Sequence, residues 1–453
     1  MVLHAPRRLR TPPRRAQSLM TSAKQQSHSH DWVRSAVSLG EDGPTGELRG
    51  DCVSALEGAG LPTTNEEQWR FCDIAPLSEL PPRAPLANQT APSGTHLKGF
   101  DRVVSIDGNG VTHSDGTRTN RAVTPMRGNI FALLNGAAYS HVHTVDASEA
   151  ERVHIVHVGA DAYSPGQIGR PLRSPRVHVR VPAGFSVTVI EEFVGGSGGL
   201  TNSVTEVSLA RGASCEHMVL QAQDIPPEDE KNPESADAAH FVRSTLVDQD
   251  EGSTYALGEL AIGSAIARHD LDVVSHGNQT HTDVKTFNLA SAHQLQDLHS
   301  RIAIDYPSCT ADQLHKSIAT SNSSHSVFDG NINVSRSGQQ TDAGQLSRNL
   351  LMAPRARVNA RPNLQINADD VSCTHGCTVS DLGELELFYF RTRGVGEELA
   401  RIALVEAFGM DVVSKMPCGE EARKHATSIL RRKLASSVGA SFGTEEVSQA
   451  GAA

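Results

Sequence analysis

Residues Leu364 to Val379 read LQINADDVSCTHGCTV and combine a strand-like pattern with the densest chemistry in the chain. In an extended strand successive side chains point to opposite faces, so Cys373, His375 and Cys377 would project from one side. Same-face positions lie about 7 Å apart, so one strand needs a second strand or chain to complete a tetrahedral metal site. The spacing alone also fits a buried strand with two inert cysteines and a hydrogen-bonded histidine.

Alternation of apolar and polar residues recurs from about Phe100 to Ser380. It predicts strands that include residues 153–155, 177–181, 186–189, 331–334 and 364–366, with turns at 182–184, 211–213 and 250–252. Short strands at fairly regular spacing, with Gly and Asn at corners and no helices between, favour a β-solenoid. A β-sandwich would give similar strand signals.

More specific motifs lie in the last third of the chain. They are VFDG at 327–330, QQTDA at 339–343, NLL at 349–351, ADDVSCTHG at 368–376 and LFYFRTRG at 387–394. LPTTNEEQWRF at 61–71 accompanies them near the amino terminus. On these motifs the chain resembles the SufB/SufD family of iron-sulfur cluster assembly proteins, and within that family the SufD branch, from about Leu61 to Val413.

This resemblance implies a mainly β fold, a right-handed parallel β-helix core with small helical regions at both ends. It implies a scaffold subunit without turnover of its own, which pairs with SufB through its last strands and binds the ATPase SufC through its carboxy-terminal helices. ATP hydrolysis in SufC would drive assembly, and the iron-sulfur cluster would be a transient cargo shared with SufB. The chain lacks Gly-x-x-x-x-Gly-Lys-Ser/Thr, so we expect no ATP site of its own.

The resemblance also assigns roles around the Cys-x-His-Gly motif. It places His375 at the SufB interface, where a SufB cysteine is the implied partner, and we expect His375 to act as a metal ligand or local base with Cys373 as a second candidate. Cys377 departs from the alanine usual in the family, and we interpret it as a packing residue rather than a ligand. Asp369 and Asp370 point to opposite faces of a strand, so we expect turn or edge hydrogen bonds from them. Two further residues, Arg391 and Arg393, are expected to contact a partner.

Composition and charge indicate the compartment in which the protein acts. Aromatic residues make up only 4% of the 453 residues, which suits narrow strands, and no apolar run is long enough to span a membrane. The net charge is −11, yet residues 1–30 contain five arginines, Lys24 and no acidic residue. That composition is typical of a transit peptide, and with the family resemblance it predicts the plastid stroma; an unstructured basic tail or a mitochondrial address are the alternatives.

These patterns divide the chain into five predicted segments. They are a transit peptide and disordered leader (1–50), an amino-terminal helical region and linker (51–98), a β-helix core (99–384), a carboxy-terminal helical domain that docks SufC (385–436) and a flexible tail (437–453). We expect little order before Val53, a capping box from Thr64 to Glu67 that opens a short helix, and an exposed insertion at 223–237. Helices are predicted at 397–408, ended by Gly409, and at 420–434.

Several other functions are disfavoured. Seven scattered cysteines without a Cys-x-x-Cys pair fit neither a disulfide framework nor a self-contained zinc or cluster site. Histidine pairs such as His141 with His143, or His276 with His281, are more often satisfied strand residues than metal ligands. The nearest rival function is a SufB-like cluster scaffold, and a rival from another class is a β-helix enzyme that acts on polysaccharides.

Overall fold

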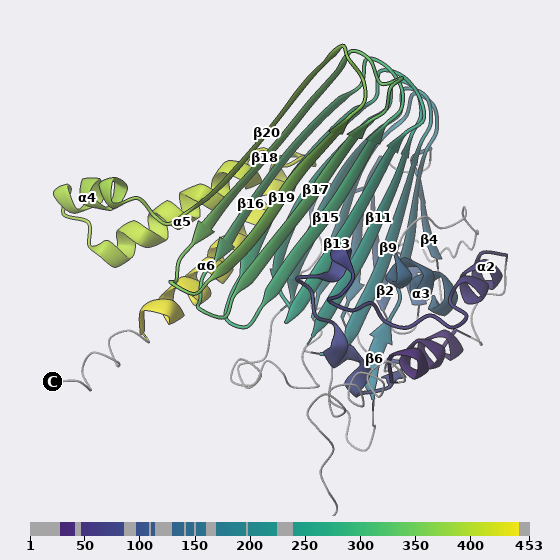
Figure 1. Ribbon diagram of the computed structural model, residues 1–453, viewed down its shortest axis with the longest axis horizontal. Helices are drawn as coiled ribbons and strands as arrows, with labels where there is room; N and C mark the ends of the chain where they lie inside the picture. The colour runs from purple at the N-terminus through teal and green to yellow at the C-terminus, as the bar shows by residue number, and fades with distance from the viewer. Residues whose placement is uncertain are drawn as a thin grey trace, which may run out of the picture.

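A computed structural model shows a long parallel β-solenoid with helices near both ends of the chain (Figure 1). It describes residues 28–40, 47–85, 97–107, 110–113, 129–139, 142–148, 151–159, 169–195, 198–223 and 239–443. The strands form two ten-stranded sheets, and from Ser186 onward successive strands alternate between them. The prediction of a mainly β solenoid is confirmed.

The two sheets are called sheet 1, which ends with β19, and sheet 2, which ends with β20. Sheet 1 contains β1 (Pro82–Arg83), β4 (Val142–Asp146), β6 (Arg170–Arg173), β7 (Arg176–Val181), β9 (Leu200–Leu209), β11 (His240–Gln249), β13 (Ile266–Ser275), β15 (Leu295–Ile304), β17 (His325–Val334) and β19 (Arg357–Ile366). Sheet 2 contains β2 (Arg102–Asp107), β3 (Gly110–His113), β5 (Arg152–Val158), β8 (Ser186–Val194), β10 (Ser214–Gln223), β12 (Thr254–Gly263), β14 (His281–Ala290), β16 (Thr310–Ala319), β18 (Thr341–Leu351) and β20 (Val371–Ser380).

Each turn of the solenoid, called a rung here, stacks in register on the previous one. Ile302 of β15 pairs with Ile332 of β17, for example, and Ile332 pairs with Leu364 of β19. Paired residues of parallel strands point to the same face, so stacked apolar side chains form a continuous interior between the two sheets. This interior core is built largely from Val, Ile, Leu and Ala, as the low aromatic content predicts.

The predicted turns lie at one corner of the solenoid and extend its hydrogen bonding. Glycines 184, 212 and 252 adopt positive φ there, and in later rungs Gln279, Ser308 and Gln340 do so at the equivalent position. Each of these residues donates its backbone N–H to a carbonyl of the next turn, for instance Gly252 to Asn278 at 2.9 Å and Ser308 to Gln339 at 2.8 Å. The corner therefore continues the ladder that joins the strands.

Helices α5 (Glu397–Val413) and α6 (Gly419–Gly443) cover the outer face of sheet 2, while α4 (Glu384–Thr392) extends away from the solenoid (Figure 1). The prediction that Gly409 ends a helix is wrong, because α5 continues to Val413. A Cβ at position 409 would lie 2.9 Å from Cδ2 of Leu430 and 3.3 Å from the Phe287 ring. Gly409 thus permits close packing of α5 against α6 and β14.

Two sets of polar contacts tie these helices to sheet 2. Glu192 accepts hydrogen bonds at 3.1 Å from Nε2 of His154 and at 2.8 Å from Nε2 of His425 in α6. Burial opposes ionisation of Glu192, but the two histidines outweigh it and lower its pKa to about 2. Lys316 of β16 lies 2.5 Å from the Asp411 carboxylate in α5 and donates to the carbonyl of Phe408 at 3.1 Å.

A separate helical cluster packs on the outer face of sheet 1. It consists of a helix at residues 28–38, α2 (Glu47–Ala55), the 3-10 turns η1 (Glu67–Trp69) and η2 (Ala75–Glu79), and α3 (Ile130–Ala138). Its apolar core reaches Leu172, Leu200 and Val242 of the sheet. The guanidinium of Arg268 lies 3.8 Å from the centroid of the Trp69 ring, which adds a cation–π contact to this packing.

The structure corrects three predictions in this region. Residues 28–40 and 47–52 are ordered, so the prediction of little order before Val53 is wrong. Trp32, for example, is packed in this region and is only 3% exposed. The predicted helix at 64–71 is one 3-10 turn, and the capping contact joins the Thr63 N–H to the Glu66 carboxylate at 2.9 Å. Helix α3 interrupts the strands, because its apolar face docks on sheet 1.

Some predicted segments extend past the described residues. Residues 1–27, His141 and residues 224–237 of the predicted insertion at 223–237 lie outside them, as do residues 444–453 of the predicted tail. Helix α6 continues to Gly443, seven residues beyond the predicted boundary at 436. None of the described helices is both long and apolar enough to cross a membrane.

Candidate functional site

Among the described residues, the last rung of the solenoid has a neighbouring rung on one side only. Strand β19 ends the described part of sheet 1 and β20 ends that of sheet 2, so both present an unpaired edge at the same end of the solenoid (Figure 1). A corner that contains Asp369 and Asp370 joins the two strands, rather than one continuous strand from 364 to 379. Open edges of this kind are available to another chain.

Cys373, His375 and Cys377 continue an inward-facing row of side chains. They pair in register with Ala343, Gln345 and Ser347 of β18, which are at most 2% exposed. Gly376, between His375 and Cys377, faces the opposite, outer side. A Cβ at this position would lie 3.1 Å from Cδ1 of Leu346, and Leu346 packs on the side of sheet 2 that the helices cover. The structure thus brings the two thiols and the imidazole to one face at the open end of the interior.

The two thiols of this row differ in their surroundings. Cys373 is half-buried and packs with Val371 and Leu364 against the interior core, and burial raises the pKa of its thiol. Cys377 is exposed. The other five cysteines are buried and none of the seven forms a disulfide. Because thiolates are the reactive and metal-binding form, Cys377 is the more available sulfur of the row.

The row does not complete a metal site by itself. Nowhere in the described chain do three or more His, Cys, Asp or Glu side chains come together in a way that could hold a metal ion. The backbone N–H of Asp370 donates to Oε1 of Gln339 at 2.9 Å, and its carbonyl accepts from the N–H of Gln340 at 2.5 Å. The backbone of Asp370 therefore joins the corner of the last rung to the preceding turn. A ligand from another chain would have to join His375 to bind a metal.

The other predicted histidines do not meet at this end. His143 is 1% exposed within β4. His281 lies on β14, where its Nδ1 is 2.5 Å from the Thr310 hydroxyl. His276 lies at the turn corner, in the groove described next.

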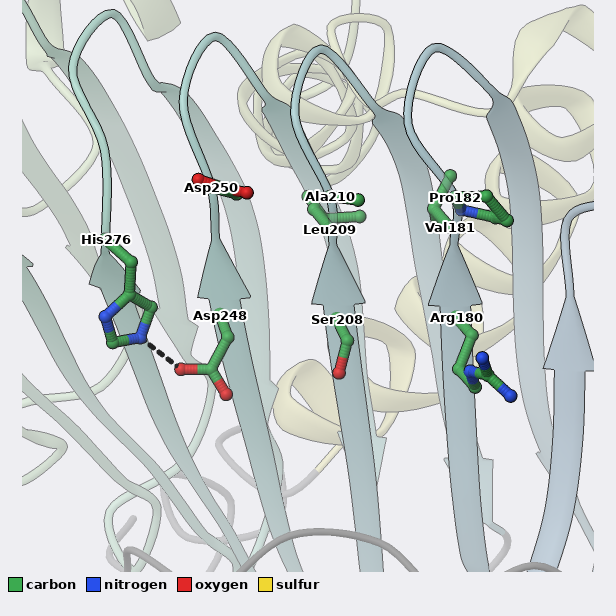
Figure 2. Close-up of a pocket in the computed structure, with 9 residues that line it drawn as sticks. All are labelled: Arg180, Val181, Pro182, Ser208, Leu209, Ala210, Asp248, Asp250 and His276. Atoms are coloured by element: carbon green, nitrogen blue, oxygen red, sulfur yellow. Dashed lines mark hydrogen bonds and ion pairs between the residues drawn. The ribbon is translucent and has the colours of Figure 1, made fainter.

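A shallow groove of about 330 Å³ crosses the outer face of sheet 1 beside the turn corner (Figure 2). Arg180 lies at one end and Asp248, Asp250 and His276 lie at the other, with Ser208 between them. Nε2 of His276 lies 2.6 Å from the Asp248 carboxylate, and the Ser208 hydroxyl lies 3.2 Å from Nε2 of His178. The residues that line the groove include none of the Cys373–Cys377 row.

Sequence patterns missed a buried charged cluster in the middle of the interior. Glu191 accepts hydrogen bonds from His157 (2.7 Å), Thr205 (2.7 Å), His217 (3.0 Å) and Arg243 (3.0 Å). Burial disfavours its charge, but Arg243 and the two histidines outweigh this and hold its pKa well below the ordinary value. No spacing signal could reveal this cluster, because its five members come from five different strands.

An exposed apolar patch lies on the carboxy-terminal helices. Leu385, Phe388 and Tyr389 of α4 and Leu399 of α5 are 82%, 62%, 58% and 65% exposed. Arg393 stacks over the Tyr389 ring at 4.8 Å, and Arg391 forms an ion pair with Glu397. Large apolar side chains gathered on a helical extension are typical of a surface that a partner covers.

Comparison with protein families finds one matching model over residues 164–408, described as SUF system FeS cluster assembly, SufBD core domain. The match extends from the early rungs through β20 into α5. It therefore contains the open rung and the Cys373–Cys377 row.

Individual relatives agree with that match. Protein ABCI7, chloroplastic, of Arabidopsis thaliana is 43% identical over 266 residues, which are 57% of this chain and 54% of that protein. Iron-sulfur cluster assembly SufBD family protein slr0076 of Synechocystis is 32% identical over 54% of this chain and 53% of that protein. The match thus spans about half the length of these two relatives. Iron-sulfur cluster assembly protein SufD of Escherichia coli is 25% identical over 79% of this chain and 86% of that protein.

Proposed function

Because the chain belongs to the SufB/SufD family of iron-sulfur cluster assembly proteins, we propose that it is a SufD-like scaffold subunit of a complex with SufB and SufC. ATP hydrolysis in SufC drives assembly, and this subunit contributes shape and ligands without turnover of its own. The observation that carries the proposal is the open last rung, which presents His375 between two thiols beside two unpaired strand edges.

SufB pairs with this chain through β19 and β20. Both strands end their sheets and lie side by side at one end of the solenoid, so a second solenoid could continue both ladders. Ile366 and Val379, 39% and 46% exposed, would become covered by such a partner.

The nascent cluster forms between His375 and a cysteine of SufB, with Cys373 as a second candidate ligand. A neutral imidazole nitrogen suits iron, and a thiolate from the partner supplies the softer ligand and negative charge. The arrangement accounts for an incomplete ligand set in the described part of this chain. The cluster is a cargo that leaves the complex.

SufC binds the carboxy-terminal helices. The exposed Leu385, Phe388 and Tyr389 on α4 offer an apolar surface that would be buried by the ATPase. Helices α5 and α6 are fixed to sheet 2 by the Lys316 and Glu192 contacts, so a movement at α4 can be passed to the solenoid.

The protein acts in the plastid stroma. The similar Arabidopsis protein carries a chloroplastic name, and residues 1–30 have the basic, acid-free composition of a transit peptide.

The test is anaerobic cluster reconstitution on this chain co-expressed with SufB and SufC. We expect His375→Ala to leave the complex assembled but to lower bound iron and visible cluster absorbance at least tenfold, because a ligand at the interface is lost.

A matched control is His276→Ala, which removes a histidine from the groove on the outer face of sheet 1 and should leave cluster loading unchanged. Equal loading of wild type and His375→Ala would make His375 structural. Failure of the chain to form any complex with SufB and SufC would contradict the scaffold role itself.

A further inference from the structure

A column of buried polar side chains ends directly beneath His375. Nε2 of Gln313 donates to the Ser300 hydroxyl at 2.8 Å, and Nε2 of Gln345 donates to Oε1 of Gln313 at 2.9 Å. All three residues are at most 3% exposed. Each amide fixes the next, so the column determines how the Gln345 amide is turned.

The last acceptor of this column is unused. Oε1 of Gln345 is buried and has no hydrogen-bond partner in the described part of the chain. The amide cannot turn freely, because its Nε2 is committed to Gln313 and lies over Gly330, where a Cβ would come within 2.4 Å of it. A buried acceptor without a donor destabilises the fold, so a donor that reaches it would be bound favourably.

The residue in position to supply that donor is His375. It pairs in register with Gln345 and faces the same interior, and adjacent strands lie about 4.8 Å apart. One imidazole N–H could therefore reach the free carbonyl oxygen once a partner covers the rung and orders the ring. A histidine that donates one ring N–H is held in one tautomer, which leaves the other nitrogen as a lone-pair ligand.

We propose that Gln345 is a positioning residue for the cluster site: its Oε1 accepts the N–H of the His375 imidazole and directs the opposite ring nitrogen toward iron. The inference rests on the proposed function, since it requires His375 to bind iron. Gln345 itself touches no iron, and its amide, unlike a carboxylate, holds the ring without adding charge.

The test compares Gln345 variants in the assembled complex with SufB and SufC. We expect Gln345→Met, which keeps the length but removes the acceptor, to release iron to a chelator about tenfold faster than wild type. Gly330→Ala should also speed release, because it displaces the amide without removing it.

A matched control separates positioning from core stability. Gln296 is another fully buried glutamine whose Oε1 has no partner among the described residues, and it lies on β15, away from the last rung. Gln296→Met should change unfolding as much as Gln345→Met does but leave iron release unchanged. Wild-type release from Gln345→Met, with His375→Ala still defective, would refute the positioning role alone. If His375→Ala also binds a normal amount of iron, then the proposed cluster site itself is wrong, and the positioning role of Gln345 is wrong with it.

Discussion

Inward-facing polar side chains have different consequences in the middle of the solenoid and at its last rung. In the middle, Glu191 lies between covering rungs and all its contacts are to this chain, with Arg243 and His217 3.0 Å away. At the end, His375 also faces inward, but no strand of the described chain stacks above it. The comparison teaches that inward polar residues stabilise the fold where rungs continue and are available for chemistry where stacking stops.

The largest expected effect on stability comes from removing a charged partner of Glu191 in the covered middle of the solenoid. Arg243→Met leaves the Glu191 carboxylate buried without its guanidinium partner, so we expect a loss of about 3–5 kcal/mol in unfolding free energy. Chemical denaturation of the purified chain measures it. Arg211→Met, which removes an exposed ion pair with Glu251, is the control and should cost at most about 1 kcal/mol. Equal losses in both variants would show that the buried cluster contributes no special stability.

A second prediction concerns the outer face that α6 covers. Glu192 has a pKa of about 2 in the folded protein against 4.5 as the ordinary value, so its contacts stabilise the fold above pH 4.5 and are lost as the pH falls toward 2. The unfolding free energy of Glu192→Gln should be about 2–3 kcal/mol below wild type at pH 6, and the difference should shrink steadily in acid. Denaturation at several pH values measures this difference. A gap that stays constant down to pH 3 would rule out the linkage.

The smallest expected effect distinguishes the two thiols of the open rung. Cys377 should react with iodoacetamide about tenfold faster than Cys373, because it is exposed while burial raises the pKa of Cys373. Peptide mass spectrometry over time measures both rates, and the five buried cysteines serve as unreactive references. Binding of SufB should slow Cys377 labelling. A faster Cys373 would mean that its packing against the core is looser than the structure indicates.

The sequence predicted the repeating strands well, because alternation in segments such as 177–181 and 331–334 directly records which side chains face inward. It also placed Cys373, His375 and Cys377 on one face. The prediction that Gly409 ends a helix was wrong, since local rules assign glycine to helix ends. Those rules do not include the close approach of Leu430 and Phe287 to that position. The Glu191 cluster and the Gln345 column depend on contacts between distant strands, which periodicity does not encode.

The attachment of α6 has a consequence for how the chain is made. His425 contacts Glu192, and the Cys418 N–H donates to Glu216 at 3.2 Å, although these partners are 233 and 202 residues apart. Strands β8 and β10 therefore leave the ribosome long before the helix that covers them. Until α6 has been synthesised, Ile190, Met218 and Leu260 are exposed to water, and we expect chaperones to bind that flank of the nascent chain.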